Sequence, residues 1–168
     1  MRILMYMAIT ANGYIAKQNH ETPWSDEEWQ SFTKMVQRIG NIVIGRKTFD
    51  IMSQGGELLS IGSPFTVIVS NKTSADSHFV SSPEEAIKLL DSKGFSEVLV
   101  AGGAMLNAAF MQKNLVDELY LDVEPFIFGQ GIKLFSDSNF ERRLTLLEAT
   151  QLSPDTIQLH YEVIKRHT

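Results

Sequence analysis

Short apolar runs divide the chain, and each is typical of a buried strand. Most of their positions are apolar on both faces, as expected for strands of a parallel sheet that is covered by helices on each side. These runs are Arg2–Thr10, Ile42–Ile44, Phe65–Val69, Val98–Val100 and Leu119–Val123. Near the end of the chain, Arg143–Gln151 and Thr156–Ile164 alternate between apolar and polar residues, which predicts an antiparallel hairpin around Pro154-Asp155.

Helical segments with start and stop signals separate these runs. The first helix begins after Ser25, a good N-cap followed by three acids that suit the helix dipole, and runs to about Ile39. Ser82 followed by Pro83 starts another helix with the preferred order of cap and proline. The pattern also predicts helices over Lys47–Met52 and Ala104–Phe110, a short edge strand at Phe79-Val80 and a loop over Gln54–Ser63.

Strands and helices alternate until the terminal hairpin. This order predicts an α/β sheet that is mainly parallel and has an antiparallel edge. The 168 residues suffice for one domain with a proper core, so residues 1–168 are predicted to form a single domain. Ligands of such sheets bind outside the carboxyl ends of the strands.

Three of these carboxyl ends carry residues that suit phosphate groups. Gly45-Arg46-Lys47-Thr48 joins a strand to a helix with two cations and a hydroxyl, and Ser70-Asn71-Lys72 repeats this chemistry. Ala101-Gly102-Gly103 supplies permissive backbone before a helix N-terminus. Taken alone, the first turn is better explained by solvated charges and an ordinary helix cap, the second means little, and the two glycines of the third favour neither a ligand site nor a simple turn. Together on one rim they favour a dinucleotide site, although the spaced GxGxxG pattern is missing.

The helix after Ser25 places an acid on its apolar face. At about 100° per residue, Trp29 and Phe32 help to define this face, and Glu28 falls near its middle. A buried carboxylate is costly without a partner, which favours a pocket where a polar ligand or a proton is handled. The alternative is that Glu28 only closes a capping box by reaching back to the Ser25 amide. The pattern supports both interpretations equally.

Other polar residues give weaker signals. Asp122 lies within a predicted strand, where it either faces solvent at the strand end, the favoured interpretation, or reaches the same pocket. The histidines have no metal-ligand spacing, so we predict no metal site. We interpret the four histidines as structural or solvated; they are His20, His78, His160 and His167.

Composition narrows the range of partners. The net charge of -5, without a basic run, argues against nucleic acid. The absence of cysteine excludes disulfides and thiolate metal sites and fits a reducing cytoplasm, which is the predicted location. No apolar run approaches the ~20 residues of a membrane span, and the first residues lack a cleavable-signal pattern, so no membrane partner is expected.

The order of these motifs resembles the dihydrofolate reductase fold over nearly the whole chain. MAITANGYIA is similar to the family's first strand and flexible loop, and the helix after Pro23-Trp24 to its substrate-side helix. Gly45-Arg46-Lys47-Thr48-Phe49 resembles the cofactor motif, VIVSNK the strand that meets the adenosine ribose phosphate, and VAGGAML the pyrophosphate segment. LVDELYLDVEPFIFGQGIKLF is more similar to the reductase domain of the bifunctional riboflavin-pathway deaminase-reductases, which share this fold.

The resemblance implies a dihydrofolate reductase-like three-layer α/β/α fold with a mixed, mainly parallel sheet and a C-terminal antiparallel hairpin. It implies NADPH as the cofactor and a small-molecule substrate that is pterin-like, as dihydrofolate is, or similar to 5-amino-6-(5-phosphoribosylamino)uracil. Glu28 would be the catalytic acid that holds the substrate ring and assists its protonation. The implied substrate-binding residues are Tyr6, Trp24, Glu28, Phe32 and Asp122. The implied cofactor-binding residues are Ala8, Ile15, Gly45, Arg46, Lys47, Thr48, Ser70, Asn71, Lys72, Ala101, Gly102, Gly103, Ala104 and Met105.

Two alternatives to an NADPH-dependent oxidoreductase stay open. A nucleotide-binding module without catalysis would bind NADPH but reduce neither substrate. If the glycine turns are structural only, no nucleotide would bind. A homodimer is expected by analogy with the riboflavin-type domains, with a contribution from the apolar segment Phe126–Phe128.

Overall fold

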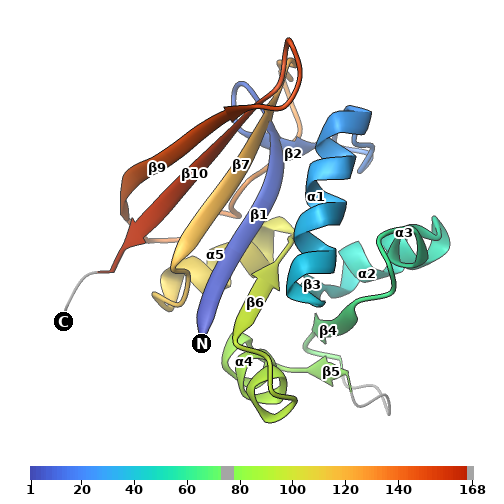
Figure 1. The fold of residues 1–168 in the computed structure, drawn as a ribbon, viewed down its shortest axis with the longest axis vertical. Coiled ribbons are helices and arrows are strands. Elements are labelled where there is room, and N and C mark those ends of the chain that lie inside the picture. The colour runs from blue at the N-terminus through green and yellow to red at the C-terminus, as the bar shows by residue number, and fades with distance from the viewer. Residues whose placement is uncertain (73–77, 166–168) are drawn as a thin grey trace.

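The computed structural model describes residues 1–72 and 78–165, and an eight-stranded sheet forms its centre (Figure 1). In spatial order the strands are β5 (Phe79–Val80), β4 (Phe65–Val69), β3 (Asn41–Gly45), β6 (Glu97–Val100), β1 (Arg2–Thr10), β7 (Glu118–Glu124), β10 (Ile157–Ile164) and β9 (Arg143–Gln151). A separate antiparallel pair joins β2 (Tyr14–Ala16) to β8 (Ile132–Lys133). The helices are α1 (Asp26–Ile39), α2 (Arg46–Gln54), α3 (Glu57–Ser60), α4 (Pro83–Ser92) and α5 (Ala104–Gln112).

The sheet is parallel from β5 to β7 and antiparallel at its other edge. Strand β1 pairs in parallel with both β6 and β7, whereas β10 runs antiparallel to β7 and to β9. Crossover helices are needed between parallel neighbours, and a short turn suffices for the terminal hairpin. The predicted mixed, mainly parallel sheet with a C-terminal antiparallel hairpin is therefore confirmed.

Two apolar layers pack on opposite faces of the sheet, because side chains alternate along each strand. Leu4 and Leu99 belong to the layer under α1, α2 and α3, together with Val36 of α1. Met5 and Val100, their neighbours in sequence, belong to the layer under α4 and α5. In Figure 1, α1 lies in front of the sheet and α5 behind it. The three-layer α/β/α arrangement is confirmed.

The helix boundaries follow the capping signals of the sequence. Ser25 caps α1 by accepting a hydrogen bond from the Glu28 amide at 3.2 Å, and Gly40 ends the helix with a φ of 79°. Ser82 caps α4 in the same way through the Glu85 amide. No helix in the described ranges is long and apolar enough to cross a membrane.

The predicted loop over Gln54–Ser63 is wrong in one respect, because it contains the short helix α3. Gly56 precedes this helix with a φ of 70°, and Leu58 and Ile61 contact the apolar layer beneath α1. Tertiary packing stabilises a single turn of helix that its local sequence pattern did not indicate.

Candidate active site

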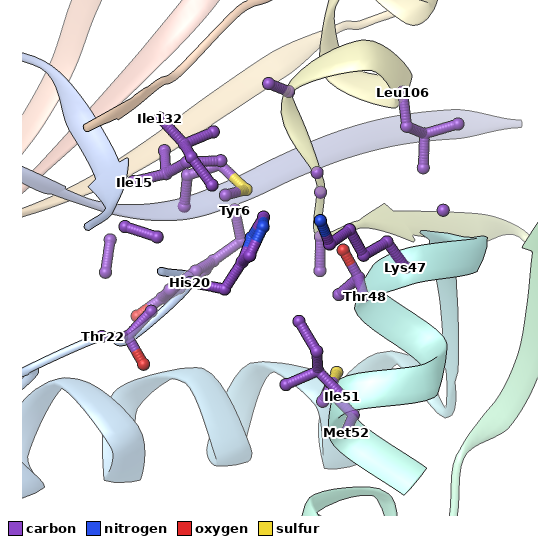
Figure 2. Close-up of a pocket in the computed structure, with 18 of the residues that line it drawn as sticks. Tyr6, Ile15, His20, Thr22, Lys47, Thr48, Ile51, Met52, Leu106 and Ile132 are labelled. Atoms are coloured by element: carbon purple, nitrogen blue, oxygen red, sulfur yellow. The ribbon is translucent and has the colours of Figure 1, made fainter. Parts of the chain in front are cut away.

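A cavity of about 890 Å³ opens at the carboxyl ends of the parallel strands (Figure 2). Its walls come from β1, the β2 and β8 pair, helix α1, and the amino ends of α2, α4 and α5. This size is ordinary for a ligand site, and its position is the one that open α/β sheets use.

Two of the three predicted phosphate turns meet at the centre of this cavity. The Gly45 amide donates to the Gly102 carbonyl at 2.8 Å, which joins the turn after β3 to the turn after β6. A Cβ added at Gly103 would lie 3.4 Å from Thr48 Oγ1, so this glycine packs closely against the first turn of α2. The Gly102–Gly103 peptide bond is cis.

Helices α2 and α5 begin at these turns without a side-chain cap. Their N-cap residues are Gly45 and Gly103, and neither provides a hydrogen bond to the first turn. The first amides of both helices are therefore without a side-chain acceptor at the cavity wall, where an anion finds donors and the positive end of a helix dipole. Ser70 and Asn71 extend this surface after β4. We call it the glycine rim, which comprises Gly45–Thr48, Ser70, Asn71 and Gly102–Met105.

The three basic residues predicted for the site differ in their positions and contacts. Arg46 donates to Asp50 at 3.0 Å and lies over the Phe79 ring, 5.2 Å from its centroid, which holds it at the β5 end of the cavity. Lys47 and Thr48 project from α2 into the cavity (Figure 2). Lys72 does not line the cavity, and its amide donates to Ser70 Oγ at 3.1 Å.

The opposite part of the cavity is aromatic and acidic. Trp29 and Phe32 of α1 pack with their ring centroids 5.8 Å apart, and Phe32 packs on Tyr6 at 5.4 Å. Trp24 closes this part and stacks on Phe128 at 6.4 Å. We call its charged residues the acid wall, which comprises Asp26, Glu28 and Glu57.

Glu28 lines the cavity and is only 4% exposed. The capping-box alternative is wrong, because the Ser25 amide donates instead to Glu124 Oε2 at 2.9 Å. Within the described residues, no hydrogen bond to the Glu28 carboxyl is found. Burial, together with the charges of Asp122 and Glu124, raises the pKa of Glu28 to about 8, so its carboxyl is largely protonated at neutral pH.

Glu124 takes the structural role that the sequence offered to Glu28. It is 1% exposed, and its Oε1 accepts hydrogen bonds from Ser25 Oγ at 2.8 Å and Thr156 Oγ1 at 3.1 Å. These bonds tie the end of β7 to the start of α1 and to the turn of the terminal hairpin. Glu28 is thereby released from capping and faces the cavity.

Asp122 is fully buried, so the favoured interpretation that it faces solvent is wrong. It accepts a hydrogen bond from the Tyr6 hydroxyl and another from Gln158 Nε2 at 2.8 Å. Burial raises its pKa to about 6, and burial beside Asp122 also raises the pKa of Tyr6. Asp122 does not line the cavity; it supports Tyr6, which does.

The structure brings most of the predicted site residues to one cavity. Seventeen of them line it: Tyr6, Ala8, Ile15, Trp24, Glu28, Phe32, Gly45, Arg46, Lys47, Thr48, Ser70, Asn71, Ala101, Gly102, Gly103, Ala104 and Met105. Lys72 and Asp122 do not.

Sequence reasoning missed several cavity residues. His20, interpreted as structural or solvated, has a φ of 70°, and its ring points into the cavity (Figure 2). Of the other histidines, His160 contacts Glu118 at 2.7 Å, and His167 lies outside the described residues. Ile51 and Met52 lay on a predicted helix, but no local pattern indicated which face would meet the cavity. Also missed were Thr22, Glu57, Ser81 and Ile132.

The family model of the RibD C-terminal domain matches residues 2–158. The chain belongs to the RibD C-terminal domain family. This membership confirms the resemblance to the riboflavin-type reductase domains. A curated relative, the uncharacterised protein YwjB of Bacillus subtilis, is 27% identical over 170 residues, which cover 95% of this chain and 97% of that protein.

Solved structures share the fold. A protein of Shewanella sp. PV-4, named for riboflavin biosynthesis, has a TM-score of 0.80 at 21% identity, covering 98% of this chain and all (100%) of that chain. The diaminohydroxyphosphoribosylaminopyrimidine deaminase/5-amino-6-(5-phosphoribosylamino)uracil reductase of Thermotoga maritima has a TM-score of 0.77 at 17% identity. It matches 97% of this chain over 56% of its own length.

Proposed function

We propose that this protein is an NADPH-dependent reductase whose substrate is a pterin-like or aminopyrimidinone-like ring. The observation that supports the proposal is the joining of the glycine rim and the buried carboxyl of Glu28 in one cavity. The glycine rim is suited to the phosphates of a dinucleotide, and the Glu28 carboxyl is suited to a ring that accepts a proton. Membership of a reductase-like family supports the same conclusion.

The chemistry of the glycine rim fits the pyrophosphate of NADPH. Amides at the uncapped starts of α2 and α5 would bind its oxygens, with Lys47 and the Thr48 hydroxyl completing the donor set. Arg46, Ser70 and Asn71 would bind the phosphate on the adenosine ribose. Lys72 is not part of this proposal, because it lies outside the cavity wall.

The buried apolar wall formed by Ala8 and Ile15 would hold the nicotinamide. When bound, the reduced nicotinamide would supply a hydride to the carbon of a C=N bond of the substrate, and a proton added to the nitrogen of that bond would complete the reduction. Glu28 would hold the ring by a hydrogen bond and deliver that proton, which its raised pKa keeps on the carboxyl at neutral pH. The surrounding aromatic side chains exclude water and fix the ring orientation.

The test is a turnover assay in which loss of NADPH is followed with dihydrofolate or 5-amino-6-(5-phosphoribosylamino)uracil as substrate, and with uncharged analogues of each. Calorimetry on the same preparation measures NADPH binding without a substrate. We expect both binding and turnover. NADPH binding without turnover of any ring would favour the non-catalytic module, and no binding at all would refute the proposed function.

Self-association and a cytoplasmic location stay predictions. Phe126 and Phe128, expected to contribute to a dimer, pack against Trp24 of the same chain, whereas Ile127 between them is 77% exposed. Light scattering on the purified protein measures the oligomeric state directly.

A further inference from the structure

The charges that line the cavity are strongly divided between its two parts. Among the described residues, Arg46 and Lys47 are the only lysine or arginine side chains in the wall, and both belong to the start of α2. The part beside α1 and α3 carries the acid wall, and His20 also lines the cavity. This division bears on the substrate of the proposed reductase, so the inference rests on the proposed function.

Both cations lie on the side of the cavity where the nucleotide is proposed to bind. Arg46 is held at the β5 end of the cavity by Asp50 and the Phe79 ring. Lys47 adjoins the uncapped amides of α2, where the pyrophosphate is proposed to bind. A second phosphate or carboxylate group, carried by the other ligand, would find neither cation available to it.

Asp26 and Glu57 of the acid wall would also repel such a group, whereas Glu28, which is largely protonated at neutral pH, would not. Glu28 is 4% exposed and, within the described residues, has no hydrogen-bond partner for its carboxyl, which points into the cavity. Glu57 on α3 is half-buried, and burial raises its pKa. Asp26 lies two residues before Glu28 at the start of α1, is exposed, and also lines the cavity. Like charges in a partly desolvated cavity interact far more strongly than they do in water.

The remaining wall around the acids is largely apolar and aromatic. Trp29 and Phe32 present aromatic rings beside Glu28, and Ile51 and Met52 face them from α2. Such a slot accepts a planar ring that donates N–H groups to a carboxyl. Within residues 1–72 and 78–165, this part of the cavity wall contains no lysine or arginine side chain that could bind a charged tail.

We propose that the substrate is a planar nitrogen heterocycle, neutral or cationic, that carries neither a phosphate nor a carboxylate group. The acid wall selects for this charge state, with Glu28 receiving the ring and Glu57 excluding anionic tails. A ring at the level of a free base or a nucleoside fits this description. A phosphoribosylated pyrimidinone and a glutamate-bearing folate both conflict with it.

Matched ligand pairs test the charge of the substrate. Dihydrofolate is compared with its glutamate diester, which keeps the bulk and removes the charge, and 5-amino-6-(5-phosphoribosylamino)uracil is compared with its dephosphorylated nucleoside. Dissociation constants for the NADPH-loaded protein are measured by calorimetry, and kcat/KM is measured where turnover occurs. We expect the uncharged member of at least one pair to be favoured by about tenfold or more, equivalent to about 1.4 kcal/mol.

Charge-reversal variants test the cause of this preference. Glu57→Lys should reduce the ratio of dissociation constants between the charged and uncharged members of a pair by about tenfold, and Glu57→Gln should reduce this ratio less. Glu27→Lys is the matched control, because Glu27 is an exposed acid of α1 outside the cavity wall, and it should leave the gap unchanged. If Glu57→Lys does not fold, the ligand pairs on the unaltered protein decide alone.

The possible outcomes separate this inference from the proposed function. Equal or tighter binding of the charged members to the NADPH-loaded protein would overturn only the inference, as would binding of no ring at all. A gap that Glu57→Lys leaves intact would also overturn it, because the acid wall would then not be its cause. Failure to bind NADPH would instead refute the proposed function.

Discussion

Helices α2 and α1 both begin at the cavity, but their amino ends are built in opposite ways. Helix α2 starts at Gly45 with no side-chain cap, so its first amides remain available. Helix α1 starts at Ser25, whose hydroxyl accepts from the Glu28 amide and whose own amide and hydroxyl donate to Glu124. An open helix end can bind an external anion, whereas a closed one holds its own side chains in place.

The comparison teaches how one cavity can present two kinds of chemistry. The glycine rim depends on glycines that have no Cβ, since an added Cβ would fill the space where the turns lie against each other. The acid wall depends on distant support, since Glu28 faces the cavity because Glu124 has taken its place at the cap. Variants that alter one part without the other should separate binding of the cofactor from chemistry on the substrate.

The largest effect is expected from Glu28→Gln. Turnover should fall by about 10²- to 10³-fold, because the amide cannot deliver a proton, while the dissociation constant for NADPH changes less than about twofold. Steady-state kinetics and calorimetry measure the two quantities. Glu27→Gln, one residue earlier and exposed, is the control and should behave like the unaltered protein. Equal losses in the two variants would remove Glu28 from its assigned role.

The pH dependence of stability should carry the signature of Glu28. Its pKa is raised from 4.5 to about 8 in the folded protein, so the folded state holds this proton more tightly than the unfolded chain does. The stabilisation is complete below pH ~4.5 and is lost as pH rises through about 8, by about 5 kcal/mol for a shift of this size. Urea unfolding at a series of pH values measures this loss, and the free energy of unfolding of Glu28→Gln should fall less steeply with rising pH than that of the unaltered protein. Identical slopes for the two proteins would contradict the raised pKa.

Glu124→Ala should weaken the support of the acid wall. It removes a buried acceptor of three hydrogen bonds, so we expect the free energy of unfolding to fall by about 2 kcal/mol. Ser25→Ala should cost about 1 kcal/mol, and the double variant should cost less than the sum because the two residues share bonds. Chemical denaturation of all three variants measures the coupling. Strict additivity would mean that the Ser25–Glu124 contact contributes nothing.

Gly102→Ala should perturb the glycine rim. Gly102 has a φ of 92°, and an added Cβ would lie 3.1 Å from Met7 Cε, so we expect a cost of about 1 kcal/mol in NADPH affinity or stability. Gly45→Ala is the milder comparison, since its Cβ would meet nothing closer than 3.7 Å. Calorimetry with NADPH and thermal unfolding distinguish the two losses. A greater defect in Gly45→Ala would reverse the expected ranking.

The smallest effect is expected from Lys72→Ala. Because Lys72 is exposed and outside the cavity wall, NADPH affinity should stay within about twofold of the unaltered protein. Lys47→Ala should weaken binding by about fivefold, since it removes a charge-assisted contact. Titrations of the two variants at the same ionic strength make this comparison. A larger loss of NADPH affinity in Lys72→Ala than in Lys47→Ala would mean that Lys72 contributes to the binding site.

The sequence could predict the fold and the location of the site because both depend on local signals. Apolar runs, the Ser25 cap and the order of strands and helices were sufficient to predict the sheet and its carboxyl rim. The glycine turns could be recognised from their residues, because glycines, hydroxyls and cations follow the predicted strands. The resemblance to riboflavin-type reductases, which the family match confirms, came from the same motifs.

What escaped prediction depends on contacts between residues far apart in the chain. Ser25-x-x-Glu28 is a correct capping signal, but nothing local shows that Glu124, 99 residues away from Ser25, occupies the cap. Asp122 was misplaced for a related reason, since its partners Tyr6 and Gln158 lie on two other strands. His20 reaches the cavity only because its backbone adopts a left-handed conformation that its sequence does not require.

The bond between Ser25 and Glu124 also orders events during folding. Helix α1 is synthesised early, yet the carboxyl group that holds its N-cap residue Ser25 belongs to Glu124 at the end of β7, and Thr156, beyond β9, holds that group in turn. Contacts that span so much of the chain form slowly, because a long loop must close first. The first helix of the protein is therefore expected to fray at its amino end until the last hairpin has docked.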